Sequence, residues 1–193
     1  MTSNERHESS VAHVTGQALF VDDVVLPEGA LHIAVGVAEN PRAELTKIDL
    51  GNVITSHGVV DVITASDIPG ANQVGPVVED EPLLVKSDVQ YTGQRIFAVA
   101  ATSQERARRA VAKADIDCLA KPAVLTIHDA LKVDSTVTPT RYWGEEDPEA
   151  LFDNAATVVD ESIYIRGQEH FYLEPQTALA LPNEDGIYVL ISS

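Results

Sequence analysis

An alanine-rich helix, predicted between two strand-like runs, most constrains what this chain can fold into. The pattern Thr102-x-x-Glu105 is a capping box, which marks the start of a helix. Four small apolar residues then recur at i, i+3, i+4 and i+7: Ala107, Ala110, Val111 and Ala114. Because these side chains are short, a helix with such a stripe can lie close on a sheet. The sequence therefore predicts a helix over residues 102–114 that packs against strands.

Strand-like segments lie on both sides of this helix. Residues 31–37 alternate large side chains with small or polar ones, which is the period-2 pattern of a strand. A short helix is expected over residues 51–57. The loop predicted over residues 71–82 contains two prolines and three consecutive acidic residues, and long ordered loops are often functional or packed against a partner. Further short strands are predicted over 18–21, 44–50, 59–64, 89–91, 95–101 and 115–119.

The clearest boundary falls over residues 132–147, a polar stretch that ends in three acidic residues. A short helix is predicted just before it, over residues 127–132. After it, Asp147 as N-cap and Pro148 as first helical residue predict a new helix. Strands are then expected over 157–165, 177–181 and 187–191, with a turn between the last two.

The net charge limits the partners of this chain. Acidic residues outnumber basic ones by 30 to 13, which gives a formal charge of −17. Nucleic acids and anionic membrane surfaces both select basic surfaces, so neither is expected as a partner. No run of 18 apolar residues predicts a membrane span. Residues 1–10 are polar, lack the apolar core of a secretory signal, and are expected to form a disordered tail.

The single cysteine, Cys118, excludes an internal disulfide and fits a reducing cytoplasm, which is the expected location. It lies in a strand-like run, and we interpret it as a small buried apolar residue rather than a nucleophile. One cysteine cannot build an iron–sulfur or zinc–thiolate site within this chain.

The segment Arg166–Pro175 carries the densest group of polar side chains and follows the strand predicted over residues 157–165. Such a cluster at a strand end is typical of a binding site. Gln168 lies next to Gly167, so it could approach a bound cofactor closely. Its amide can donate a hydrogen bond to an oxo or carbonyl group without a change of charge.

Three other pairs have simpler interpretations. His170 and Glu174 are spaced i, i+4 as in zinc-binding helices, but the second histidine and the helical propensity are missing, so we expect hydrogen bonding in a polar interface. Asp22-Asp23 are expected to cap a turn, since neighbours on a strand point to opposite faces. Gly93-Gln94 indicates a bulge or a close backbone approach. No metal ligand is assigned.

Four motifs, in order, resemble the molybdenum-binding subunit of the xanthine dehydrogenase family, which includes xanthine oxidase and aldehyde oxidase. The most specific is Gly167-Gln168-Glu169-His170-Phe171-Tyr172-Leu173-Glu174. The other three are His13-Val14-Thr15-Gly16-Gln17-Ala18-Leu19-Phe20-Val21-Asp22-Asp23, Tyr91-Thr92-Gly93-Gln94 and Pro122-Ala123-Val124-Leu125-Thr126-Ile127.

The resemblance implies an α+β fold. An α/β hammerhead domain is expected over residues 11–120 and a linker over 121–147. Residues 148–193 would form a truncated start of the molybdopterin-binding domain. In the family, the glutamine that Gln168 matches lies beside the molybdenum centre and hydrogen-bonds an oxo ligand. Many relatives have glycine where this chain has Arg166.

The resemblance also implies an activity. Complete enzymes of this type hydroxylate purines, xanthine and hypoxanthine to urate, with water as oxygen source. They use a molybdenum–molybdopterin cofactor, and pass electrons to 2Fe-2S clusters and FAD carried elsewhere in the assembly. The expected partners are the remainder of the molybdenum subunit, the subunit with FAD and iron–sulfur clusters, and a purine substrate, in an oligomer.

The family's catalytic residues lie downstream of the sequence that this chain covers, so no catalytic residue is assigned. The 193 residues alone are expected to be inactive. Two alternatives stay open: a non-catalytic scaffold, assembly module or truncated product, and part of an aldehyde oxidase-like molybdenum hydroxylase.

Overall fold

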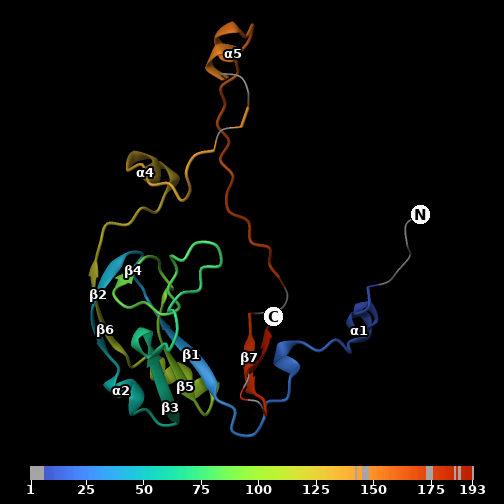
Figure 1. Ribbon diagram of the computed structural model, residues 1–193, viewed down its shortest axis with the longest axis vertical. Helices are drawn as coiled ribbons and strands as arrows, with labels where there is room; N and C mark the ends of the chain where they lie inside the picture. The colour runs from blue at the N-terminus through green and yellow to red at the C-terminus, as the bar shows by residue number, and fades with distance from the viewer. Residues whose placement is uncertain are drawn as a thin grey trace. The chain divides into compact units, whose positions relative to one another are not determined.

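The computed structural model describes residues 7–141, 143–144, 148–172, 176–184, 186 and 188–192. The chain divides into two compact units. One is the continuous stretch Pro27–Arg141, and the other combines Met1–Leu26 with Tyr142–Ser193. Figure 1 shows the helices and strands of both.

The continuous unit contains two antiparallel sheets of three strands each. In the first, β5 (Arg95–Ala101) lies between β1 (His32–Val37) and β3 (Val59–Thr64). In the second, β2 (Ala43–Asp49) lies between β4 (Asp88–Val89) and β6 (Asp115–Ala120) (Figure 1).

All of these strands were predicted, with ends that differ by one or two residues at most positions. All three helices predicted for this unit are present: α2 (Gly51–Ile54), α3 (Gln104–Val111) and α4 (Ile127–Lys132). The first two are shorter than the predicted ranges 51–57 and 102–114, and α4 has the predicted bounds. A short 3-10 helix that was not predicted, η2, covers Ala65–Asp67.

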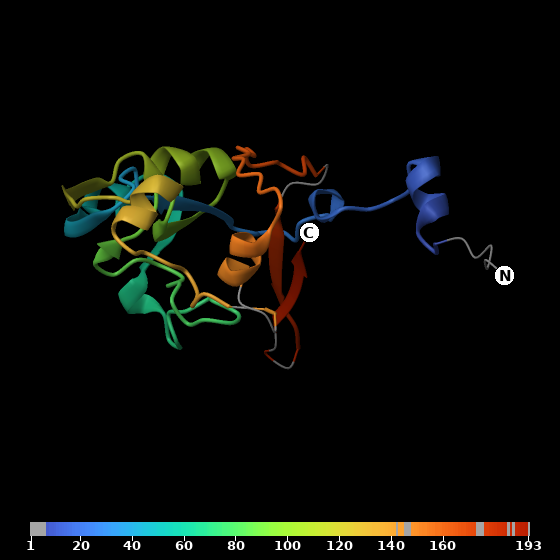
Figure 2. The same ribbon diagram turned by 90° about the horizontal axis from the view of Figure 1, so that it is seen from above.

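Helix α3 lies against β1 and β5, as its alanine stripe predicts (Figure 2). Ala107 and Ala110 are fully buried. The predicted capping box is wrong by one residue, because Ser103 is the N-cap and its Oγ accepts from the Arg106 N–H at 3.3 Å. Thr102 uses its Oγ1 instead to accept a hydrogen bond from Arg106 Nη1 at 2.6 Å. Glu105 pairs with Arg109 one turn further on.

The core of this unit joins the two sheets, α2 and α3. The large buried side chains at its centre are Phe97, Ile96, Val53, Val85, Val89 and Val99. Burial of aliphatic side chains of this size stabilises a fold by about 1.5–3 kcal/mol each. Since β5 contributes three of the six, it is the central strand in packing as well as in topology.

The predicted loop 71–82 has no regular secondary structure, as expected. Asn72 fixes its base, because its side chain donates to the Leu84 carbonyl at 2.7 Å and accepts from the Leu84 N–H at 2.9 Å. The loop tip is exposed, with Val77 91% accessible.

The second unit contains α1 (Ser10–Thr15), η1 (Val21–Asp23), α5 (Pro148–Asn154) and the hairpin β7–β8 (Ala178–Pro182 and Tyr188–Ser192). The hairpin and α5 were predicted, and α1 was not. Residues 1–6 of the predicted tail, and the predicted cap Asp147, lie outside the described residues.

The strand predicted over residues 18–21 is wrong, because a 3-10 turn begins at Val21. Asp23 satisfies this turn locally by accepting from the Phe20 N–H at 3.0 Å. The backbone therefore needs no neighbouring strand, and the turn-capping role proposed for this acidic pair is confirmed for Asp23.

Candidate functional site

The motif around Gln168 lies in an extended, exposed segment. The strand predicted over residues 157–165 is wrong, since residues 155–172 contain no helix or strand. The last three side chains of the predicted strand are 79–85% exposed: Ile163, Tyr164 and Ile165. The segment therefore has the composition of a strand but no neighbouring strand to pair with. A strand needs hydrogen bonds from another strand, and the described part of this segment receives none.

Gln168 is exposed and has no hydrogen bond within the described part of the chain. Gly167 has no atom within 4 Å of the position where a side chain would begin, so its backbone is open to approach. Phe171 adopts a left-handed backbone with φ of 54°, and its N–H lies 3.4 Å from the Glu169 carboxylate. The segment thus presents its polar side chains outward.

The hydrogen bonding expected for His170 and Glu174 stays a prediction, because residues 173–175 lie outside the described residues. Among the residues that are described, no three His, Cys, Asp or Glu side chains come together in a way that could hold a metal ion.

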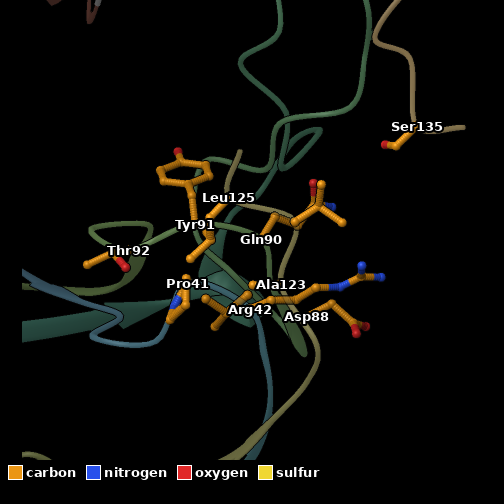
Figure 3. A pocket seen from close by; sticks show the side chains of 11 residues that line it. Pro41, Arg42, Asp88, Gln90, Tyr91, Thr92, Ala123, Leu125 and Ser135 are labelled. Atoms are coloured by element: carbon orange, nitrogen blue, oxygen red, sulfur yellow. The ribbon is translucent and has the colours of Figure 1, made fainter. Parts of the chain in front are cut away.

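A separate open pocket of about 810 Å³ lies in the continuous unit (Figure 3). The Arg42 and Asp88 side chains lie on one side of this pocket and Thr92 lies on the other (Figure 3). The residues that line the pocket are Pro41, Arg42, Asp88, Val89, Gln90, Tyr91, Thr92, Ala123, Val124, Leu125 and Ser135. The sequence did not predict this pocket, because its walls come from four separate segments.

Charge pairs hold the wall of this pocket in place. Lys121 lies 2.8 Å from Asp88 and 3.1 Å from Glu44, and so links β6 to β4 and β2. The hydrogen bond from Lys121 lowers the pKa of Asp88, and the hydrogen bond to Asp88 in turn raises the pKa of Lys121. Glu44 and Asp88 are exposed and Lys121 is half-buried, and their ion pairs connect the strands of this wall.

Gln94, which hydrogen-bonds to a residue of the pocket wall, is the one buried polar side chain among the described residues, with 1% exposure. Its Oε1 accepts from the Gln90 N–H at 2.7 Å. The preceding Gly93 has φ of +91°, and its N–H donates to the Ala38 carbonyl at 2.7 Å. The predicted special backbone at this pair is therefore a left-handed turn, which presents Tyr91 at the pocket.

Cys118 is partly buried and packs against the core, as predicted for a small apolar residue. Burial, with help from Asp117 and Glu39, raises the pKa of its thiol. A raised pKa disfavours the thiolate, so Cys118 is a poor nucleophile.

The two parts of the chain match two successive domains of known proteins. Residues 15–122 match the family model "Aldehyde oxidase and xanthine dehydrogenase, a/b hammerhead domain". The chain belongs to this family. Residues 128–193 match the "Molybdopterin cofactor-binding domain". The expected α+β fold with an α/β hammerhead domain is confirmed, as are the family resemblance and the molybdopterin cofactor.

Relatives from the same family align with nearly the whole chain. Aldehyde oxidase 3 of Rattus norvegicus is 36% identical over 190 residues, which is 95% of this chain and 14% of that protein. Xanthine dehydrogenase 1 of Arabidopsis thaliana is 36% identical over 195 residues, 99% of this chain and 14% of that protein. The chain thus spans about one seventh of the length of these relatives.

Among solved structures, the aldehyde oxidoreductase from Desulfovibrio gigas superposes with a TM-score of 0.83 at 30% identity, over 96% of this chain and 23% of that chain. Within the described ranges, no helix is both long and apolar enough to cross a membrane.

Proposed function

We propose that this chain is part of the catalytic subunit of a molybdenum hydroxylase that converts xanthine or hypoxanthine to urate with water as oxygen source. The observation that carries the proposal is the succession of a hammerhead domain and a molybdopterin-binding domain over residues 15–122 and 128–193. In this proposal FAD and 2Fe-2S clusters, carried elsewhere in the assembly, accept the electrons.

Gln168 is the residue proposed to contact the molybdopterin cofactor, and its surroundings fit this role. Its carboxamide has no hydrogen-bond partner within the described segments, so the donors and the acceptor are all available. The absence of atoms around Gly167 leaves room for a bulky group beside the backbone. The Gln168 side chain is uncharged. Such a neutral contact suits a cofactor whose own charge changes during the reaction.

The cofactor, when bound, supplies the two-electron oxidation of the substrate. The contribution of Gln168 is to orient the cofactor with a neutral N–H donor. Glu169 and His170 follow it in the chain and are proposed to support its position. Neither forms part of a metal-ligand cluster among the described residues.

A second candidate is the oxidation of aldehydes to carboxylic acids. The rat aldehyde oxidase at 36% identity and the aldehyde oxidoreductase structure with TM-score 0.83 favour it. Purine and aldehyde oxidation share the cofactor and the role proposed for Gln168, so the two candidates differ in substrate alone.

The substrate is tested with the complete enzyme of which this chain is part. Xanthine, hypoxanthine and benzaldehyde are supplied separately in ¹⁸O-labelled water, and the products are analysed by mass spectrometry. We expect labelled urate. Labelled benzoate without urate would establish the second candidate, and an enzyme without molybdenum that turns over neither class would refute both.

The role of Gln168 is tested with Gln168→Ala and Gln168→Glu. Loss of an outer contact to a metal centre costs about 10–100-fold in affinity or activity. We expect both variants to shift the electron paramagnetic resonance signal of the reduced molybdenum. Gln176→Ala, a described and exposed glutamine outside the motif, is the control. An unchanged spectrum in Gln168→Ala at full molybdenum content would remove Gln168 from the site.

A reducing cytoplasm is the proposed location, because the single cysteine cannot form an internal disulfide. Fractionation of source cells tests this location. The proposed partners are the remainder of the molybdenum subunit and the chain or domain that carries FAD and 2Fe-2S.

A further inference from the structure

A cationic groove on helix α3 stands out on an otherwise acidic chain with a net charge of −17. It lies between α3 and the turn at residues 56–58, and encloses about 770 Å³. We call it the α3 groove. Its lining residues are Ser56, His57, Ser103, Glu105, Arg106, Arg109, Ala110 and Lys113.

The three cations of the α3 groove come from the helix and from the turn that follows it. Arg106 and Arg109 are spaced i, i+3 in α3, so they lie within about 60° of each other around the helix axis. Lys113 lies in the turn after the C-cap Ala112 and lines the same groove. Arg108 is about 130° from the mean direction of the two arginines and does not line the groove.

Two of these cations have no carboxylate partner, whereas the third, Arg109, pairs with Glu105. Lys47, Arg95, Lys121 and Lys132 all pair with carboxylates. Arg106 and Lys113 instead donate to neutral hydroxyls, Thr102 Oγ1 at 2.6 Å and Ser56 Oγ at 2.9 Å. Their charge is left available to a partner.

The backbone is shaped to hold Arg106. Gly58 has φ of +84°, and a side chain there would begin 2.4 Å from Arg106 Cδ. The Gly58 carbonyl also accepts from the Thr102 N–H at 2.9 Å, which fixes the threonine that binds the guanidinium. Arg106 is thus preorganised, so binding a carboxylate costs less side-chain entropy.

We propose that the α3 groove docks a carboxylate-rich polypeptide segment, supplied by the other domains or subunit of the complete enzyme. This inference rests on the proposed function only for the identity of the assembly. The groove brings three cations together, and their positive charge complements the carboxylates of such a segment. Glu105 already pairs with Arg109, so a polypeptide with separate carboxylates can reach Arg106 and Lys113, and competition by inorganic phosphate tests the alternative of one compact phosphate. Nucleic acid is disfavoured by the charge of the whole chain.

The first test identifies the occupant in the complete enzyme. A carbodiimide joins Lys113 to a carboxylate in contact with it, and peptide mass spectrometry locates the product. We expect a cross-link from Lys113 to an Asp or Glu outside residues 1–193. Lys113→Arg, which keeps the charge and lacks the reactive amine, should abolish this cross-link. A link confined to a second copy of this chain, or no link from Lys113, would overturn the proposal.

The second test measures docking strength. Arg106→Glu/Lys113→Glu is compared with Arg108→Glu/Lys86→Glu, which changes the net charge equally at exposed positions outside the groove. We expect at least a tenfold weaker assembly, or for a single polypeptide a tenfold faster amide exchange over residues 103–113, in the first variant alone. Equal effects in both variants, or competition by 10 mM inorganic phosphate at constant ionic strength, would contradict polypeptide docking.

Circular dichroism shows whether a variant is misfolded. Lys113→Gln removes one charge without reversing it, and so separates weaker docking from misfolding. If the enzyme lacks molybdenum but the Lys113 cross-link persists, the proposed function fails and the docking surface stands. If molybdenum and turnover are normal and the cross-link is missing, the reverse holds.

Discussion

Arg95 donates from Nη2 to Glu81 Oε1 at 3.1 Å, and so ties the central strand β5 to the long loop that precedes β4. The same carboxylate oxygen accepts from the Tyr91 hydroxyl at 2.8 Å. One glutamate therefore joins the loop, the turn beside the pocket and the core strand.

Replacing Glu81 with alanine should loosen this junction. Both side chains of the ion pair are about 40% exposed, so solvent screens the pair, and we expect a loss of about 1 kcal/mol in the free energy of unfolding. Urea denaturation measures it. Glu79→Ala removes an equal charge from the same loop and is the control. Equal destabilisation by both would show that loop charge matters and the junction does not.

The junction should also give an alkaline signature. The hydrogen bond to Glu81, burial and the negative charge of Glu81 raise the pKa of Tyr91. The folded state then holds this proton more tightly than the unfolded state, so the stabilisation is complete below the unfolded pKa near 10 and is lost as pH rises through the folded pKa. The tyrosinate absorbance of Tyr91→Phe, subtracted from that of the wild type, measures the pKa of Tyr91. In a Glu81→Gln background it should move down, and a value unaffected by that change would contradict the assignment.

Lys121 should instead affect the stability of the fold at acid pH, through its ion pair with Asp88. Its hydrogen bond lowers the pKa of Asp88, so the folded state binds this proton less tightly than the unfolded state. The stabilisation is complete above the unfolded pKa of 3.8 and is lost as pH falls through the folded pKa. Lys121→Met should flatten the acid limb of a stability–pH profile, whereas Lys86→Met should leave its slope unchanged.

Gly36 should not tolerate alanine. The added methyl carbon would lie 2.0 Å from Phe97 Cε1, and Phe97 is 1% exposed in the core. Overpacking of this kind costs about 1–3 kcal/mol. Gly70→Ala, where no atom lies within 4 Å, should stay within about 0.5 kcal/mol of the wild type. Thermal unfolding of both variants compares them, and a neutral Gly36→Ala would show that the aromatic ring moves freely.

Gln94 should be needed for its hydrogen bond more than for its volume. Gln94→Leu fills a similar space but leaves the Gln90 N–H without the acceptor that it has at 2.7 Å. An unsatisfied buried donor costs about 1–3 kcal/mol. The exposed Gln104→Leu should be nearly neutral in the same urea experiment. Similar stability of the two variants would mean that water replaces the lost acceptor.

The sequence predicts the hammerhead unit well, because its signals are local. Alternation specifies β1 and β2, and the alanine stripe specifies which face of α3 is buried. Helix α4 begins and ends at the predicted residues, and Thr126 caps it, because its side chain accepts from the Asp129 N–H at 3.1 Å. Where two hydroxyls compete for one cap, as Thr102 and Ser103 do, composition does not choose between them.

The rest depends on contacts that no local pattern contains. Residues 157–165 have strand composition, but a strand exists only with a neighbour to pair with. The pocket beside Tyr91 and the α3 groove each combine distant segments, and the groove depends on the room that Gly58 leaves for Arg106. The cofactor role of Gln168 and the domain limits 11–120 and 148–193 stay predictions.

The division of the chain has a consequence for biosynthesis. The unit Pro27–Arg141 is continuous, so it can fold as soon as its last residue leaves the ribosome. The other unit joins both ends of the chain, and Asp22 lies 3.4 Å from Thr177, 155 residues later. At a synthesis rate of 5–20 residues per second, the N-terminal segment waits about 8–30 s for this partner. The unit Pro27–Arg141 can therefore be folded before the segment proposed to touch the cofactor has left the ribosome, and a ribosome-bound chain stalled just after Arg141 leaves the exit tunnel should already show its protected amides.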